Sequence, residues 1–133
     1  MFKVVREIHF SYGHRLLHYQ GKCANLHGHN ARVLVEVSSQ MLNPQGMVMD
    51  FYKIREAIET WIDKTMDHKT ILCDKDPLAA ILKDAGESVV MISENPTAEV
   101  LAKWIFEEAR RMLLPVSRVT LWETEDSAAI YHE

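Results

Sequence analysis

Cysteine is scarce in this chain of 133 residues, which contains only Cys23 and Cys73. A disulfide-stapled secreted domain needs more cysteines, and residues 1–7 have neither the charge pattern nor the apolar stretch of a secretion signal. We therefore expect a cytoplasmic protein whose thiols are reduced. Cys23 lies four residues before a pair of histidines, and the residues alone leave open whether its thiol is reactive or an inert buried group.

Long apolar runs and an excess of positive charge are also missing. No apolar stretch approaches the roughly 18 residues of a membrane-spanning helix. A net charge of −4 argues against a nucleic-acid or anionic-membrane binder, because such proteins display a basic surface. The sequence also contains no glycine-rich dinucleotide motif and no P-loop.

What is present predicts one domain over residues 1–133, since 47% of the residues are hydrophobic and no internal repeat divides the chain. Apolar residues alternate from Phe2 to His14, which predicts a strand whose core-facing side ends in that histidine. A second strand is predicted over 26–38, where alternating valines share a face with His27 and His29. An antiparallel pairing of the two strands would bring all three histidines together.

Two longer segments have helical periodicity. Apolar residues recur at helical spacing over 51–66, after Asp50 as a plausible N-cap, and a second helix begins at Asn95–Pro96 and ends before Pro115. The other predicted segments are a helical piece at 76–86, a strand or buried loop at 89–92, and strands at 119–123 and 128–132. We therefore predict an α+β fold of order β-β-α-α-β-β, a four-stranded antiparallel sheet with two helices on one face. Its open edges could pair with other copies of the chain.

The residues His27-Gly28-His29 carry the clearest chemical signal. On a strand this spacing places both imidazoles on one face, and His14 supplies a third from the neighbouring strand. Three neutral imidazoles with a free fourth position have the composition of a catalytic zinc site. A single buried histidine is more often a hydrogen-bonded core residue, and a cupin-like metal site is another reading, but two long helices in so short a chain argue against a cupin barrel.

Six motifs together resemble the 6-pyruvoyl-tetrahydropterin synthase family, and they run in order along nearly the whole chain. They are Phe10-Ser11-Tyr12-Gly13-His14-Arg15-Leu16, Cys23-x-x-x-His27-Gly28-His29, Val48-Met49-Asp50-Phe51, Asp67-His68, Pro96-Thr97 and Trp122-Glu123-Thr124. The three residues between Cys23 and His27 resemble the 6-carboxy-tetrahydropterin synthase branch, which feeds queuosine biosynthesis. The segment 70–95 departs from compact family members by its length, which leaves the substrate branch open.

The resemblance implies the tunnelling fold, in which two stacked trimers form a homohexamer with active sites between subunits. It also implies roles for eight residues: zinc ligands (His14, His27, His29), a general base (Cys23), its catalytic partners (Asp67, His68), a pterin anchor (Glu123) and a further pterin contact (Thr97). From the residues alone, a helix end is the preferred interpretation of Asp67-His68. Glu123 could be a solvated strand residue, but it shares a strand face with the apolar Val119 and Leu121, which argues against this. Arg15, Lys22, Arg32 and Lys69 are weaker candidates for contacts with a triphosphate.

The implied reaction converts 7,8-dihydroneopterin triphosphate to 6-carboxy-5,6,7,8-tetrahydropterin, with release of acetaldehyde and triphosphate. Zinc would act as a Lewis acid on the substrate, and a cation near Cys23 would favour its thiolate. Two alternatives remain at this stage. One is formation of 6-pyruvoyl-tetrahydropterin or a related side-chain cleavage, and the other is a non-catalytic protein that binds a metal or a pterin.

Overall fold

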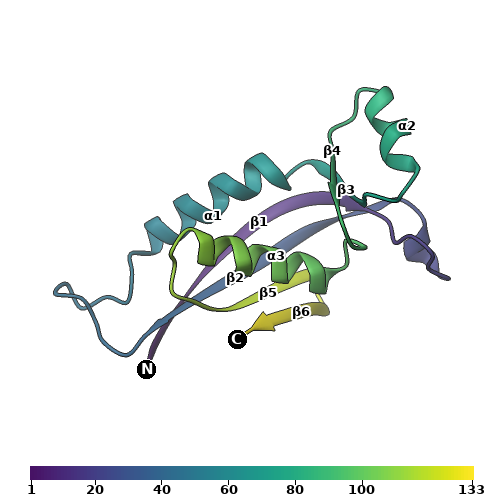
Figure 1. Cartoon of the computed structure of the whole chain (residues 1–133). Helices are drawn as coiled ribbons and strands as arrows, with labels where there is room; N and C mark the ends of the chain where they lie inside the picture. The colour runs from purple at the N-terminus through teal and green to yellow at the C-terminus, as the bar shows by residue number, and fades with distance from the viewer.

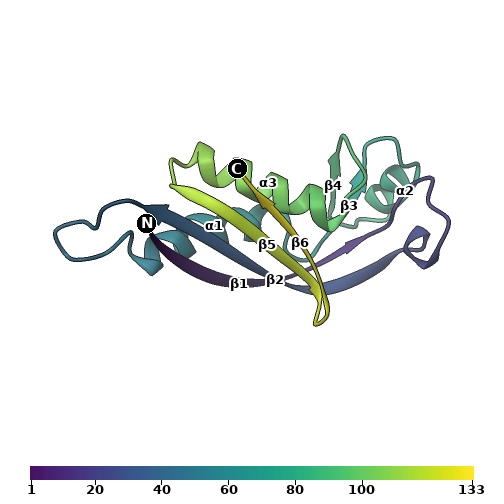
Figure 2. The same cartoon turned by 90° about the horizontal axis from the view of Figure 1, so that it is seen from below.

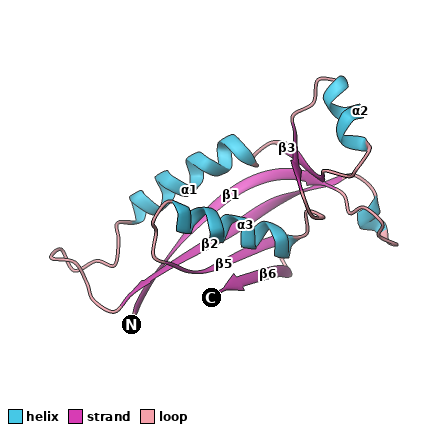
Figure 3. Ribbon diagram, viewed as in Figure 1, coloured by secondary structure: helices cyan, strands magenta, loops and turns pink.

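The computed structural model describes all residues, 1–133, and contains a curved six-stranded sheet, three α-helices and a short 3-10 helix (Figures 1 and 3). The elements in chain order are β1 (Phe2–His14), η1 (Lys22–Ala24), β2 (His27–Ser39), α1 (Phe51–Thr65), β3 (Lys69–Cys73), α2 (Leu78–Asp84), β4 (Val89–Ile92), α3 (Ala98–Arg111), β5 (Val116–Thr124) and β6 (Ser127–His132). The longest helix has 15 residues, and none of the three has the length and apolar character needed to traverse a bilayer.

The predicted α+β architecture is confirmed, but the predicted strand count was wrong. The sheet order is β4-β3-β1-β2-β5-β6, and the antiparallel strands β1, β2, β5 and β6 are the four that the sequence predicted. β3 and β4 extend this sheet in parallel to β1 and to each other. β3 was missed because Ile71, Leu72 and Cys73 are all buried, and a short apolar run without alternation does not distinguish a strand from a buried loop.

β1 and β2 form a long antiparallel pair whose register explains how the histidines meet. Every residue from Phe2 to His14 has a partner in β2, and His14 stands directly opposite His27. Along both strands one face is buried, because Phe10 and Tyr12 of β1 and the valines of β2 pack toward the helices. A shift of register by one residue would turn these apolar side chains to solvent, so core burial determines which histidines are paired.

The two long helices cover one face of the sheet and leave the other open (Figure 2). In α1, Ile54, Ile58 and Ile62 recur at every fourth position and are fully buried, which explains why this face packs on the strands. The predicted N-cap is confirmed, since the Asp50 carboxylate accepts a 2.9 Å hydrogen bond from the Tyr52 N–H. α1 also meets α3 through an edge-to-face contact of Trp61 with Trp104, at 5.3 Å between ring centroids.

The segment from β3 to β4 lies at the same end of the molecule as the loop between β1 and β2, residues 15–26 (Figures 1 and 2). Arg15 joins the two through two hydrogen bonds to Asp76, of 2.8 and 2.5 Å. The Asp76 side chain is fully buried, and the hydrogen bond from Arg15 holds the pKa of this carboxyl below its ordinary value. Arg15, a candidate for a contact with a triphosphate, is therefore already paired with a carboxylate of its own chain.

Candidate active site

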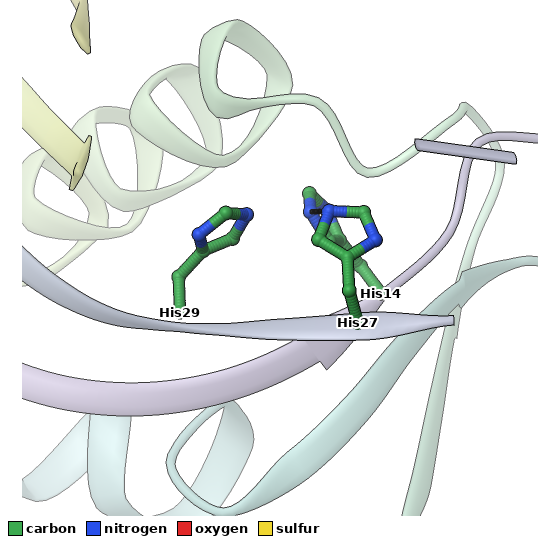
Figure 4. A group of neighbouring side chains, drawn as sticks. All are labelled: His14, His27 and His29. Carbon is green, nitrogen blue, oxygen red and sulfur yellow. Dashed lines mark hydrogen bonds between the residues drawn. The ribbon is translucent and has the colours of Figure 1, made fainter. Parts of the chain in front are cut away.

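Three imidazoles converge at the end of the β1–β2 pair, as the sequence predicted (Figure 4). His14 is the last residue of β1, His27 the first of β2, and His29 stands two residues further on the same face. One nitrogen of each ring lies within 4.8 Å of one nitrogen of the others, and the Nε2 atoms of His14 and His27 are 3.0 Å apart. His14 is only 2% exposed, so the cluster is anchored at the edge of the core.

Backbone carbonyls determine which ring nitrogens carry the protons. The Nδ1 of His14 is 2.7 Å from the Pro96 carbonyl oxygen, and the Nδ1 of His27 is 2.7 Å from that of Asn25. Because a carbonyl oxygen only accepts hydrogen bonds, each Nδ1 must donate, and in a neutral ring Nε2 then presents a lone pair. Two such lone pairs face each other at 3.0 Å and repel unless a cation or a proton lies between them.

These residues fit a bound metal ion. Burial lowers the pKa of His14, which favours the neutral imidazole that a metal ion binds. A carbonyl behind a ligating imidazole is also the usual outer contact of a metal site, because it fixes both the ring orientation and the tautomer. The donor set of three imidazoles suits a first-row ion such as zinc and leaves a coordination position for a substrate.

Glu123 of β5, which the sequence predicted as a pterin anchor, lies next to this cluster. One of its carboxylate oxygens, Oε1, lies 3.4 Å from Nε2 of His14 and 3.5 Å from Nε2 of His29. The same oxygen accepts a 3.0 Å hydrogen bond from the hydroxyl of Tyr12, which is 3% exposed. Burial raises the pKa of Tyr12, so the group remains a hydroxyl and continues to donate. Tyr12 thus holds one edge of the Glu123 carboxylate.

A cavity of about 290 Å³ joins this carboxylate to two other predicted residues, Cys23 and Thr97. Cys23 is half-buried within η1, and its carbonyl accepts a 2.9 Å hydrogen bond from the Leu16 N–H. The Thr97 hydroxyl caps α3 by accepting a 3.3 Å hydrogen bond from the Val100 N–H, which leaves its O–H free to donate to a ligand. His14 also lines this cavity, so a metal ligand, a thiol, a hydroxyl and a carboxylate border one space.

Asp67 and His68 are placed elsewhere within the same chain. They follow α1, where Asp67 accepts a 2.9 Å hydrogen bond from the Ser11 N–H and its other oxygen lies 2.9 Å from Nδ1 of His68. Burial would raise the pKa of Asp67, but the hydrogen bonds from Ser11 and His68 outweigh it, so the pKa lies below its ordinary value. The His68 side chain is 81% exposed and borders a different cavity, of about 470 Å³, which is also lined by Ser11, Lys69 and the cluster residues His27 and His29 but not by Cys23. One chain by itself therefore does not place His68 in the cavity that Cys23 lines.

Comparison with known protein families assigns the chain to one of them. The profile of the 6-pyruvoyl tetrahydropterin synthase family matches residues 3–133. The chain belongs to this family. A protein of Aquifex aeolicus named 6-carboxy-5,6,7,8-tetrahydropterin synthase is 38% identical over 125 residues, which cover 84% of this chain and 76% of the relative. A protein of the same name from Rickettsia felis is 34% identical over 131 residues, covering 93% of this chain and 95% of the relative.

Solved structures agree with this assignment. A protein from Wolinella succinogenes superposes with a TM-score of 0.84 at 25% identity, covering 99% of this chain and 98% of that one. The 6-pyruvoyl tetrahydropterin synthase of Caenorhabditis elegans superposes with a TM-score of 0.74 at 26% identity, covering 99% and 95%. The six-stranded sheet described above is therefore the tunnelling fold of the 6-pyruvoyl tetrahydropterin synthase family.

Two features of this family member escaped sequence reasoning. Tyr12 was given no role of its own, although it lies on the same strand face as His14, two residues away, and this parity is the signal that could have revealed it. Asn95 was read only as the start of a helix, whereas its side chain contacts Leu17 in the loop before Cys23. No local pattern marks that second contact, because 78 positions separate the two residues.

The hydroxyl of Tyr12 is expected to stabilise the fold by holding Glu123. A Tyr12→Phe variant should lose about 1.5–3 kcal/mol in free energy of unfolding, because a hydrogen bond to a charged group is removed at a buried position. Urea denaturation measures this change. Tyr131→Phe is the matched control, since its hydroxyl contacts Glu133 at 3.1 Å in an exposed position, and it should change the free energy much less. Equal losses in the two variants would contradict a special role for the Tyr12 contact.

Proposed function

We propose that the chain converts 7,8-dihydroneopterin triphosphate to 6-carboxy-5,6,7,8-tetrahydropterin in a zinc-dependent reaction. One water is consumed, and acetaldehyde and triphosphate are released. The electrons that reduce the ring come from the substrate's own side chain, so no external reductant is needed. The observation that carries the proposal is the single cavity bordered by His14, Cys23, Thr97 and Glu123, in a chain whose relatives are named for this product.

In this proposal His14, His27 and His29 hold the zinc ion. When bound, zinc supplies a Lewis acid for the substrate's side-chain hydroxyls. Cys23 removes a proton from the substrate side chain as the general base. The fixed Nδ1–H groups of His14 and His27 keep their Nε2 lone pairs directed at the metal position.

Glu123 and Thr97 orient the ring in the proposed complex. A carboxylate offers two parallel acceptors, which match the 2-amino group and the neighbouring ring N–H of a pterin. Tyr12 supports this task, because its hydrogen bond fixes the carboxylate before the ligand arrives. The Thr97 hydroxyl donates from the wall of the same cavity.

We further propose that the active enzyme is a homohexamer of two trimers and that Asp67-His68 acts on the site of a neighbouring subunit. The separation of His68 from the cavity of Cys23 supports this, since a proton-transfer partner must come within hydrogen-bonding reach. The edge strands β4 and β6 give the sheet two free edges along which subunits can pair.

Product analysis tests the proposed reaction directly. The purified protein loaded with zinc should convert 7,8-dihydroneopterin triphosphate to equal amounts of 6-carboxy-tetrahydropterin and acetaldehyde, measured by chromatography of the pterin and derivatisation of the aldehyde. A pyruvoyl product without acetaldehyde would overturn the proposal in favour of the 6-pyruvoyl reaction. A pterin that is bound but recovered unchanged would indicate a binding protein.

A further inference from the structure

The loop of residues 15–26 carries Cys23 and has few hydrogen bonds of its own. Within it, the Leu16 N–H donates to the Cys23 carbonyl at 2.9 Å, two further N–H groups donate to carbonyls within the single turn of η1, and that turn has no side-chain cap. Contacts with the rest of the chain hold the two ends of the loop, Arg15 with Asp76 at the start and the Asn25 carbonyl with His27 at the end, but not its middle. Connecting loops of this kind open more readily than the strands they join, unless other parts of the chain hold them. A general base on such a loop needs an external support to keep its sulfur in place.

Asn95 provides two hydrogen bonds to this loop. Its side-chain oxygen accepts from the Leu17 N–H at 2.8 Å, and its side-chain NH₂ donates to the Leu17 carbonyl at 2.8 Å. The side-chain amide of Asn95 thus satisfies both the N–H and the C=O of Leu17, as a residue of a neighbouring antiparallel strand would. The pattern also fixes the orientation of the amide, because a flipped side chain would place donor against donor and acceptor against acceptor.

The position of Asn95 is itself tied to the metal cluster. The next residue, Pro96, is buried and accepts the hydrogen bond from Nδ1 of His14, and Thr97 is the N-cap of α3. Of these three consecutive residues, Asn95 therefore binds the loop of Cys23, Pro96 binds His14 of the cluster, and Thr97 lines the cavity. One path from the thiol to the cluster runs through Leu16 and Leu17 to Asn95 and Pro96, and from there to His14. A second runs through Asn25, whose carbonyl accepts from His27.

We propose that Asn95 is a positioning residue, which holds the loop carrying Cys23 in register with the three-histidine cluster. Loss of the amide would leave His14 on its strand and its contact with Pro96 intact, so the cluster would persist while the loop moved. Because a displacement of a catalytic group by about 1 Å can cost about 100-fold in rate, the effect should fall on turnover. This kinetic consequence rests on the proposed function, whereas the effect on the loop does not.

The test compares Asn95→Ala with Asn43→Ala. Asn43 is a matched control, because its side chain likewise makes two hydrogen bonds to the backbone. Its oxygen accepts from the N–H groups of Gln45 and Met47, in a loop at the other end of the sheet. In Asn95→Ala, amide hydrogen exchange across 15–26 should be at least about 10-fold faster, and alkylation of Cys23 by iodoacetamide should accelerate. Metal content should stay at the wild-type level, and kcat should fall about 10- to 100-fold with little change in KM. Asn43→Ala should leave all of these unchanged.

Asn95→Asp is the second variant and guards against poor folding of the first. It keeps the size of the side chain and the acceptor for the Leu17 N–H, but places an oxygen against the Leu17 carbonyl, so the same direction of change is expected. Unchanged exchange of 15–26 in both variants would overturn the proposal, and so would faster exchange with unchanged kcat. If the wild-type protein does not turn over the pterin, the proposed function fails, while exchange and alkylation still decide whether Asn95 holds the loop.

Discussion

A Cys23→Ala protein should bind as much metal as the wild type and turn over the pterin about 10²- to 10⁴-fold more slowly, the usual contribution of a general base. The metal is retained because the three imidazoles come from β1 and β2, and truncation of the Cys23 side chain leaves the backbone carbonyls that orient His14 and His27 in place. Turnover falls because the cavity then contains no thiol to accept the substrate's proton. Single-turnover kinetics and metal analysis of the same preparation measure the two quantities together.

Cys73→Ala is the control for this experiment. Its thiol is buried in β3 and lies at 3.8 Å from a carboxylate oxygen of Asp74, outside both cavities described above. Its removal should leave turnover at the wild-type level. Persistent turnover in Cys23→Ala would show that the thiol is not the base.

Mixing the Cys23→Ala protein with a His68→Ala protein extends the same test to the assembly. If each site takes its thiol from one subunit and His68 from a neighbour, reassembled hybrids should recover about a quarter of the wild-type activity, since only one combination in four has both groups. Each variant alone should remain inactive. No recovery after verified subunit exchange would place both groups in one chain and contradict the shared site.

The second large effect is expected at His27, where truncation should abolish stable metal binding. A His27→Ala protein loses one of three imidazoles, and its affinity for zinc should fall by more than about 100-fold. Mutation of a residue that only hydrogen-bonds to a metal ligand costs about 10- to 100-fold, so loss of a ligand itself should cost more. His27 is only half-buried at the end of its strand, so the fold should tolerate the change. Equilibrium dialysis against zinc measures the affinity.

Thermal unfolding gives an independent reading of the same change. Zinc should raise the Tm of the wild type, because an ion that binds only the folded state stabilises it by mass action, and it should not raise the Tm of His27→Ala. His9→Ala is the control, since this histidine is exposed on the open face of β1 and contacts Glu7. Full zinc content in His27→Ala would refute the assigned ligand set.

Much of this fold could be predicted because its main elements have regular patterns. The alternation in β1 and β2 showed which face is buried, and the spacing of Ile54, Ile58 and Ile62 showed α1. β3 was missed because it is short and buried without alternation, and β4 was predicted only as a strand or a buried loop at 89–92. Their place in the sheet depends on pairing with β1, a contact that has no local signature.

The sequence by itself determined the three-histidine cluster, because strand alternation places His14, His27 and His29 on core-facing sides wherever the two strands pair. Only the tertiary structure decided that Tyr12 holds Glu123, that Asn95 holds the loop of Cys23, and that His68 stands apart from that cavity. The physical reason is the separation of the contacting residues along the sequence. Alternation and helical spacing are consequences of local backbone geometry, whereas the contacts of Tyr12 and Asn95 span 111 and 78 positions and exist only once the helices have packed on the sheet.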